Sequence, residues 1–243
     1  MNAQIEAIVL KSFDYQDYHK IVKLISPSHG LISVFISYAN QKKSRYRALA
    51  EPLTLVTMTV KSPRTENDGL FYLVHGDIQD GFYDLKMDYE KVMYFYEMAQ
   101  IIISGDIDLG ELPYAYRTLK GVLEAEAATS FDLGLGVVIF KVKMMVATGI
   151  TPAVDGCVEC GRTNEIVTAS VSAGGLICAS CYTGDGIWLA TELISLWRGL
   201  FKLPLDSLFQ LEVGGEELEL LETWMNSYYE MYSNVRFAKK LKT

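Results

Sequence analysis

The sequence has few of the residues on which most enzyme active sites depend. Its 243 residues include only three histidines, His19, His29 and His75, and only four cysteines. It contains no G-x-S-x-G, H-E-x-x-H or G-x-x-x-x-G-K-[ST] motif, so we find no nucleophile elbow, zinc-protease helix or phosphate-binding loop. We therefore predict that the chain is not an enzyme.

Long hydrophobic runs are also missing. No apolar stretch approaches eighteen residues, so we expect no transmembrane helix and no membrane partner. Residues 1–6 lack the basic region and apolar segment of a secretory signal peptide. The chain shows no export signal, and its four cysteines have the spacing of zinc ligands, which need a reducing compartment to stay free of disulfides. We therefore expect a cytoplasmic location.

Positive charge is scarce and unevenly distributed. The net charge is −8, which by itself argues against a nucleic-acid partner. Residues 1–80 hold nine lysines and arginines against eight acids, whereas residues 81–243 hold thirteen against twenty-two. The acidity therefore belongs to the second part, and the first part is able to carry a local basic face.

All four cysteines lie in one short stretch of the chain. Cys157 and Cys160 form one C-x-x-C pair, Cys178 and Cys181 form a second, and seventeen residues separate the pairs. This spacing is typical of a closed tetrahedral zinc site with a structural role, and we expect one Zn²⁺ per chain. Two reduced or disulfide-linked pairs, or an iron–sulfur or redox centre, remain as alternatives.

The first eighty residues read as short strands separated by turns. Alternating or β-branched apolar segments occupy residues 6–11, 18–25, 31–36, 53–60 and 70–75. Five short strands in about eighty residues predict a small Greek-key β-barrel, of which the OB-fold is the commonest five-stranded case. An SH3-like barrel is the rival interpretation.

The hydrophobic period changes to that of helices after residue 80. Helices are expected at about 89–103, 113–128, 131–148, 189–201 and 216–237, and a zinc module at about 150–185 interrupts them. We therefore predict an α+β multidomain chain, with an OB-fold domain at 1–80 and a mostly α-helical domain at 81–243. The tyrosines near residues 94–96 and 228–232 have helical spacing and are expected in the core.

A basic segment separates the third and fourth expected strands. Lys42, Lys43, Arg45 and Arg47 fall within seven residues, beside Tyr46, and no acid occurs in this segment. Lysines and arginines neutralise phosphates, and an aromatic ring can stack on a base. An ordinary solvated loop is the competing interpretation. The zinc module holds one arginine, no lysine and four acids, so we expect it to bind phosphates poorly.

The arrangement of these segments resembles the RecO family of bacterial DNA-repair and recombination mediators over essentially the full length. The resemblance rests on residues 8–11 and 21–25, on Pro27 to Ser33, on Lys43 to Arg45 with Glu51 to Leu53, and on Gly149 to Pro152 leading into Cys157. No single motif is unique to the family, but their order and spacing together are specific. The chain departs from the family at Phe13, Asp14 and Asp17, where other members carry more lysine and arginine.

The resemblance implies a function without catalysis. It implies binding of single- and double-stranded DNA, annealing of complementary strands, and help in loading RecA onto DNA coated by single-strand-binding protein. The implied partners are RecR and the tail of single-strand-binding protein, at the nucleoid in the cytoplasm. The implied DNA-binding residues are Lys11, Lys20, Lys42, Lys43, Arg45 and Arg47. A non-catalytic protein-interaction adaptor that does not bind DNA is the alternative function.

Overall fold

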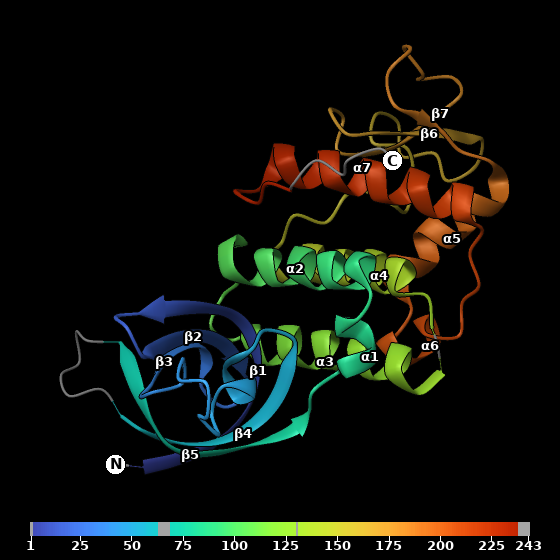
Figure 1. Ribbon diagram of the computed structural model, residues 1–243. Helices are drawn as coiled ribbons and strands as arrows, with labels where there is room; N and C mark the ends of the chain where they lie inside the picture. The colour runs from blue at the N-terminus through green and yellow to red at the C-terminus, as the bar shows by residue number, and fades with distance from the viewer. Residues whose placement is uncertain (1, 63–68, 130, 238–243) are drawn as a thin grey trace. The chain divides into compact units, whose positions relative to one another are not determined.

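The computed structural model describes residues 2–62, 69–129 and 131–237 (Figure 1). Their contacts group the chain into two compact units. Unit 1 comprises Met1–Ala99 and Ile107–Phe131, and unit 2 comprises Gln100–Asp106 and Asp132–Thr243. Within the described residues, no helix has both the length and the apolar character needed to cross a bilayer.

Unit 1 is built on a closed five-stranded barrel, the ring of blue to teal strands in Figure 1. The strands are β1 (Asn2–Tyr15), β2 (His19–Ser26), β3 (Gly30–Ile36), β4 (Thr54–Lys61) and β5 (Leu70–Asp80). They follow the order β1-β2-β3-β5-β4, β1 also pairs with β4, and only the β3–β5 pair is parallel. This ring is OB-like and confirms the predicted fold of the N-terminal part.

The barrel core follows from the alternation of its strands. On β4, Val56, Met58 and Val60 are fully buried, whereas Thr57 and Thr59 between them face outward and are partly exposed. Two strands are longer than predicted. β1 pairs with β4 along its first half and with β2 along its second half, with a register shift after Val9. The parts of β1 and β5 beyond the predicted segments are rich in polar residues, so the apolar pattern did not indicate them.

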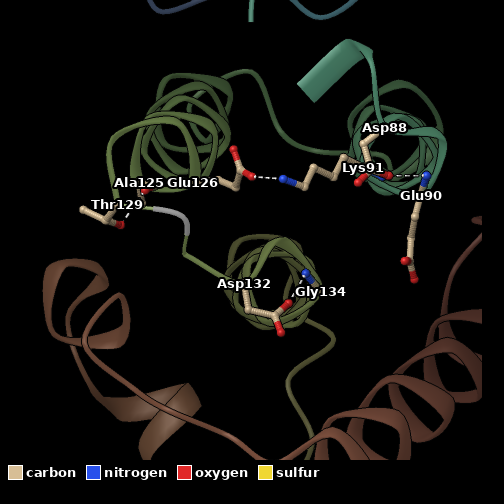
Figure 2. A network of polar contacts seen from close by, with 8 residues as sticks. All are labelled: Asp88, Glu90, Lys91, Ala125, Glu126, Thr129, Asp132 and Gly134. Carbon is tan, nitrogen blue, oxygen red and sulfur yellow. Dashed lines mark hydrogen bonds and ion pairs between the residues drawn. The ribbon is translucent and has the colours of Figure 1, made fainter. Parts of the chain in front are cut away.

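Helix α3 (Leu112–Thr129) packs on the barrel. The hydroxyl of Tyr116 donates to the Glu6 carboxylate on β1, and Lys120 Nζ lies 3.0 Å from the same group. Helix α2 (Tyr89–Ser104) is joined to α3 by an ion pair between Lys91 and the buried Glu126 (Figure 2). A single-turn helix, α1 (Tyr83–Lys86), precedes α2.

Unit 2 combines helices with a small sheet. Its main helices are α4 (Leu133–Ala147), α5 (Thr191–Lys202) and α7 (Gly215–Tyr232), with the single turn α6 (Leu205–Leu208) between the last two. Strands β6 (Ile166–Ser170), β7 (Gly175–Cys178) and β8 (Ile187–Trp188) form a sheet of order β7-β6-β8. The mostly helical region with its cysteine cluster matches the predicted α+β class.

Several element boundaries differ from the prediction. The side chain of Asp132 accepts hydrogen bonds from the N–H groups of Gly134 and Leu135, so α4 begins at Leu133 rather than at Phe131 (Figure 2). The last helix ends at Tyr232 and does not reach Phe237. The division into domains at residue 80 stays a prediction. By contacts, the helical residues 81–99 and 107–131 group with the barrel.

Candidate nucleic-acid interface and four-cysteine cluster

The basic segment forms a compact loop between β3 and β4. Successive turns close it, with the N–H groups of Gln41, Ser44 and Arg47 donating to carbonyls three residues earlier at 3.0–3.2 Å. A short 3₁₀ helix, Ala48–Ala50, follows and buries Leu49 against the barrel core. The backbone of the loop is thus held in place while its charged side chains point to solvent.

Four cations of this loop lie uncompensated on the surface, and we call them the basic loop: Lys42, Lys43, Arg45 and Arg47. All four are exposed, and among the described residues none forms an ion pair with a carboxylate. Four like charges held close together raise the local positive potential. The arrangement suits an anionic polymer such as a nucleic-acid backbone.

Tyr46 anchors this loop. Its side chain is half-buried and packs against the barrel core, and the Arg45 guanidinium lies over its ring, 4.6 Å from the ring centre. This contact helps to hold the Arg45 guanidinium in place, and base stacking by Tyr46 stays a prediction.

Lys11 on β1 and Lys20 on β2 differ in their charged contacts. Lys20 Nζ lies 2.8 Å from Asp14 Oδ1, directly across the β1–β2 pair, and this contact lowers the pKa of the Asp14 carboxyl. Lys11 is exposed and lies 5.1 Å from the centre of the Phe13 ring. Lys11 is therefore available to an external anion, whereas Lys20 already forms a surface ion pair with Asp14.

The four cysteines come together in unit 2. Their sulfur atoms all lie within 4.8 Å of one another, and the Cys160 and Cys178 sulfurs are 3.7 Å apart. None of the four cysteines forms a disulfide bond. A tetrahedral zinc site with Zn–S bonds of about 2.3 Å requires sulfur–sulfur separations of about 3.8 Å. The donor set and its spacing therefore fit a metal ion bound by four thiolates.

The backbone shapes the first C-x-x-C turn. The Gly161 N–H donates to the Cys157 carbonyl, and the Cys157 N–H donates to the Arg162 carbonyl, both at 2.8 Å. Gly161 adopts a φ of +73°, as expected for the residue that closes such a turn. Near the second pair, Gly174 also has a positive φ. Gly175 instead lies close to Ala153, where a Cβ would meet the carbonyl oxygen at 2.4 Å.

Neighbouring groups shift the pKa values of two of these thiols in opposite directions. Burial opposes ionisation of Cys157, but backbone N–H groups around its sulfur outweigh burial and lower its pKa to about 6. The thiols of Cys160 and Cys178 raise the pKa of Cys181 to about 12. Four clustered thiols cannot all lose their protons without a positive charge among them, which a bound metal ion supplies.

Helices α5 and α7 hold the cysteine module in place. The Arg198 guanidinium on α5 donates to the carbonyls of Val154, Asp155 and Thr163, which flank the first cysteine pair. Trp224 Nε1 on α7 donates to the Ala169 carbonyl of β6 at 3.1 Å. Sequence reasoning missed Arg198, because nothing in the local sequence links it to cysteines some forty residues earlier. Arg162, the only arginine of the module, pairs with Glu165 at 2.6 Å.

Comparison with known proteins agrees with this architecture. A family model described as "Recombination protein O N terminal" matches residues 1–82, and one described as "Recombination protein O C terminal" matches residues 110–241. A DNA repair protein RecO of Bacillus pumilus is 27% identical over 238 residues, covering 97% of this chain and 91% of that protein. Proteins of the same name from Listeria monocytogenes (27% over 232 residues; 95% and 89%) and Halalkalibacterium halodurans (26% over 237 residues; 97% and 91%) are similar. The chain therefore belongs to the RecO family of DNA repair proteins, which mediate recombination without catalysis.

Proposed function

We propose that this protein is a DNA-binding recombination mediator of the RecF-pathway type. It binds single- and double-stranded DNA, anneals complementary strands, and assists RecA loading together with RecR at the nucleoid. The basic loop on the OB-like barrel is the observation that carries this proposal, because four exposed cations there lack a described carboxylate partner. OB-folds commonly bind oligonucleotides on the barrel surface and its loops.

The mechanism follows from electrostatics. Two complementary strands repel each other through their phosphates, and this repulsion slows their encounter. The basic loop, together with Lys11 on β1, neutralises phosphates and releases their counterions. Repulsion between the strands then weakens, and complementary bases are able to pair. The barrel does not need to contact base edges, so annealing is expected to be independent of sequence.

A salt titration tests the role of the basic loop. In the variant with Lys42, Lys43, Arg45 and Arg47 all replaced by alanine, we expect weaker DNA binding and slower annealing. The slope of log affinity against log salt is negative, and its magnitude should decrease by about 0.7 for each single-strand phosphate that the variant no longer neutralises. Arg117→Ala combined with Lys202→Ala removes exposed cations from two helices as a control and should leave the slope unchanged. An unchanged slope in the basic-loop variant would contradict the assignment.

A protein-interaction adaptor is the alternative function, and the strong net negative charge of residues 81–243 favours it for that part of the chain. In that case RecR and the tail of single-strand-binding protein bind the chain while DNA does not. Fluorescence anisotropy with labelled single-stranded DNA, at low and moderate salt, separates the two functions. Salt-dependent binding by the purified protein supports the mediator, and no binding at low salt supports the adaptor.

We also propose that the cysteine cluster binds one structural Zn²⁺ through Cys157, Cys160, Cys178 and Cys181. A closed shell of four thiolates leaves no position for a catalytic water, so the metal stabilises the fold of unit 2. Metal analysis of the purified protein tests this directly. About one zinc per chain supports the proposal, and iron or well under one zinc per chain contradicts it.

A further inference from the structure

Aromatic rings gather on the outer surface of the barrel. We call this set the aromatic face. It comprises one ring from each of β1, β2, β3 and β5 and one from the β3–β4 loop: Tyr15, His19, Phe35, Tyr72 and Tyr38.

Strand register places these rings on one side of the sheet. Phe35 pairs with Tyr72 across β3 and β5, and Tyr15 pairs with His19 across β1 and β2. The residue before Phe35, Val34, is fully buried in the barrel core. Because successive side chains of a strand point to opposite faces, Phe35 and the rings in register with it point outward.

The rings form one continuous chain of contacts. The centre of the Phe35 ring lies 5.9 Å from Tyr15, 5.7 Å from Tyr72 and 5.1 Å from His19. His19 in turn lies 5.1 Å from Tyr38. Such separations are those of interacting aromatic pairs, which hold one another in fixed orientations. The face is therefore preorganised rather than a set of independent surface rings.

Tyr38 is presented by an unusual backbone conformation. Its φ is +57°, in the left-handed region that a bulky residue adopts only at a cost in free energy. Its N–H donates to His19 Nδ1 at 3.1 Å, which fixes the orientation of the imidazole. Its side chain is nevertheless 56% exposed, and that of Tyr15 is 44% exposed. The chain thus holds Tyr38 in a strained conformation while leaving its ring open to solvent.

Positive charge borders the face. Lys11 and Lys23 lie opposite each other in the next outward row of the sheet, and Lys61 on β4 pairs with Tyr72 on β5. None of these three lysines forms an ion pair within the described part of the chain. Asp14, which lies between Phe13 and Tyr15 on β1, is already paired with Lys20. Flat rings bordered by unpaired cations are complementary to a ligand with both flat apolar groups and negative charge.

We propose that the aromatic face stacks the unpaired bases of a single DNA strand, while the bordering lysines and the basic loop hold its phosphates. This inference rests on the proposed function and adds a discrimination to it. Bases of a duplex are stacked inside the helix and cannot reach the rings, whereas every unpaired base presents a flat face. The aromatic face therefore contributes to the binding of single strands and not to that of duplexes.

The variant Tyr15→Thr/Tyr38→Asn tests the proposal with little risk to folding. Threonine suits a strand, and asparagine tolerates a positive φ, so both backbone conformations are retained. We expect about a fivefold or larger loss of affinity for an oligothymidine of about 15 nucleotides. Duplex affinity and the salt slope should stay unchanged. Tyr89→Ser removes a 77% exposed tyrosine from α2 and is the matched control, with both affinities unchanged.

The outcomes separate this inference from the proposed function. If the double variant binds single strands as tightly as the wild type while the basic-loop variant loses affinity, the aromatic face is not a stacking site and the proposed function stands. If single-strand and duplex affinities fall equally, the rings do not discriminate and the inference is overturned. If the wild-type protein binds no DNA at low salt, the proposed function fails first.

Fluorescence gives an independent test. In Tyr15→Trp, stacking of a base on the new indole should quench its emission when oligothymidine is added. Duplex DNA should leave the emission unchanged. The three native tryptophans all lie in unit 2, and a wild-type titration subtracts their signal. Quenching by both ligands, or by neither, contradicts the proposal.

Discussion

Gly30 shows how a single residue joins the barrel to a helix. It begins β3 with a φ of +65°, and a Cβ at this position would lie 2.8 Å from Leu112 Cδ1 on α3. Two separate features, the left-handed backbone and the close approach to Leu112, therefore favour glycine over any larger residue. The glycine turn that the sequence marks as the end of a hairpin is also a contact point between elements more than eighty residues apart.

We predict that Gly30→Ala lowers the free energy of unfolding. The left-handed conformation alone costs an alanine about 1–2 kcal/mol, and displacement of Leu112 adds to that cost. Urea unfolding followed by circular dichroism measures the change. Gly69→Ala is the control, because Gly69 has a φ of +55° but nothing within 4 Å of an added Cβ. Equal losses of stability in the two variants would show that the close approach to Leu112 is unimportant.

Buried charge is the residue-scale feature that the sequence could not reveal. The segment of α4 reads as apolar, and its two lysines are nevertheless buried. Lys141 Nζ lies 2.7 Å from Asn226 Oδ1 on α7, and Lys143 Nζ donates to the carbonyls of Leu200 and Leu203 at the end of α5. Burial lowers the pKa of Lys143. Hydropathy places lysines on surfaces, and only tertiary packing shows that these two satisfy distant polar groups.

At the scale of elements, β1 and α3 are tied through one carboxylate. The Tyr116 hydroxyl and then Lys120 are the main causes that lower the pKa of Glu6 below its usual value of 4.5. A folded-state pKa below the unfolded value stabilises the fold above pH 4.5. This contribution is lost as the pH falls through the folded-state pKa.

We therefore predict a pH-dependent effect of Glu6→Gln. Above pH 4.5 the variant should be less stable than the wild type by about 1 kcal/mol or less, because the Glu6 side chain is 43% exposed and solvent screens the contact. The difference should shrink as the pH falls below 4.5. Urea unfolding at several pH values measures it, with Glu219→Gln, at an exposed position of α7, as the control. A difference that is constant with pH would refute the linkage.

The cysteine module makes a prediction at the same scale. Cys160→Ser should lower the zinc content below one per chain. It should also lower the free energy of unfolding by roughly 2 kcal/mol or more, a fraction of the about 10–16 kcal/mol that structural zinc contributes in small peptides. DNA affinity at low temperature should change little, because the basic loop lies in the other unit. Metal analysis, thermal melting and anisotropy measure the three effects. A large loss of DNA affinity with unchanged melting would contradict a structural role.

Much of the element pattern could be predicted from the sequence, and the exceptions have physical reasons. Period-2 and period-3.6 patterns identified the five barrel strands and the main helices. The strands of the cysteine module were missed because β6, β7 and β8 are only two to five residues long and lie among glycines and turns. Residue type and spacing were enough to predict the basic loop as a DNA-binding site and the cysteines as metal ligands. The aromatic face needs the register of four strands, which residue spacing along one strand does not supply.

At the scale of the whole molecule, unit 1 does not end where the strands end. Residues 1–80 complete the barrel, but Leu112 and Tyr116 of α3 also pack against it. A fragment of residues 1–80 would expose the apolar surface that α3 covers, and we predict that it melts at a lower temperature than a fragment of residues 1–131. Thermal unfolding of both fragments tests this. Equal melting temperatures would instead favour the predicted boundary at residue 80.

The late position of α3 in the chain has a consequence during synthesis. A ribosome adds about 5–20 residues per second, so the helix that completes the first unit emerges several seconds after the last barrel strand. During this interval the nascent barrel presents an uncovered apolar side to the crowded surroundings of the exit tunnel. Slower codons between residues 80 and 131 would prolong this interval.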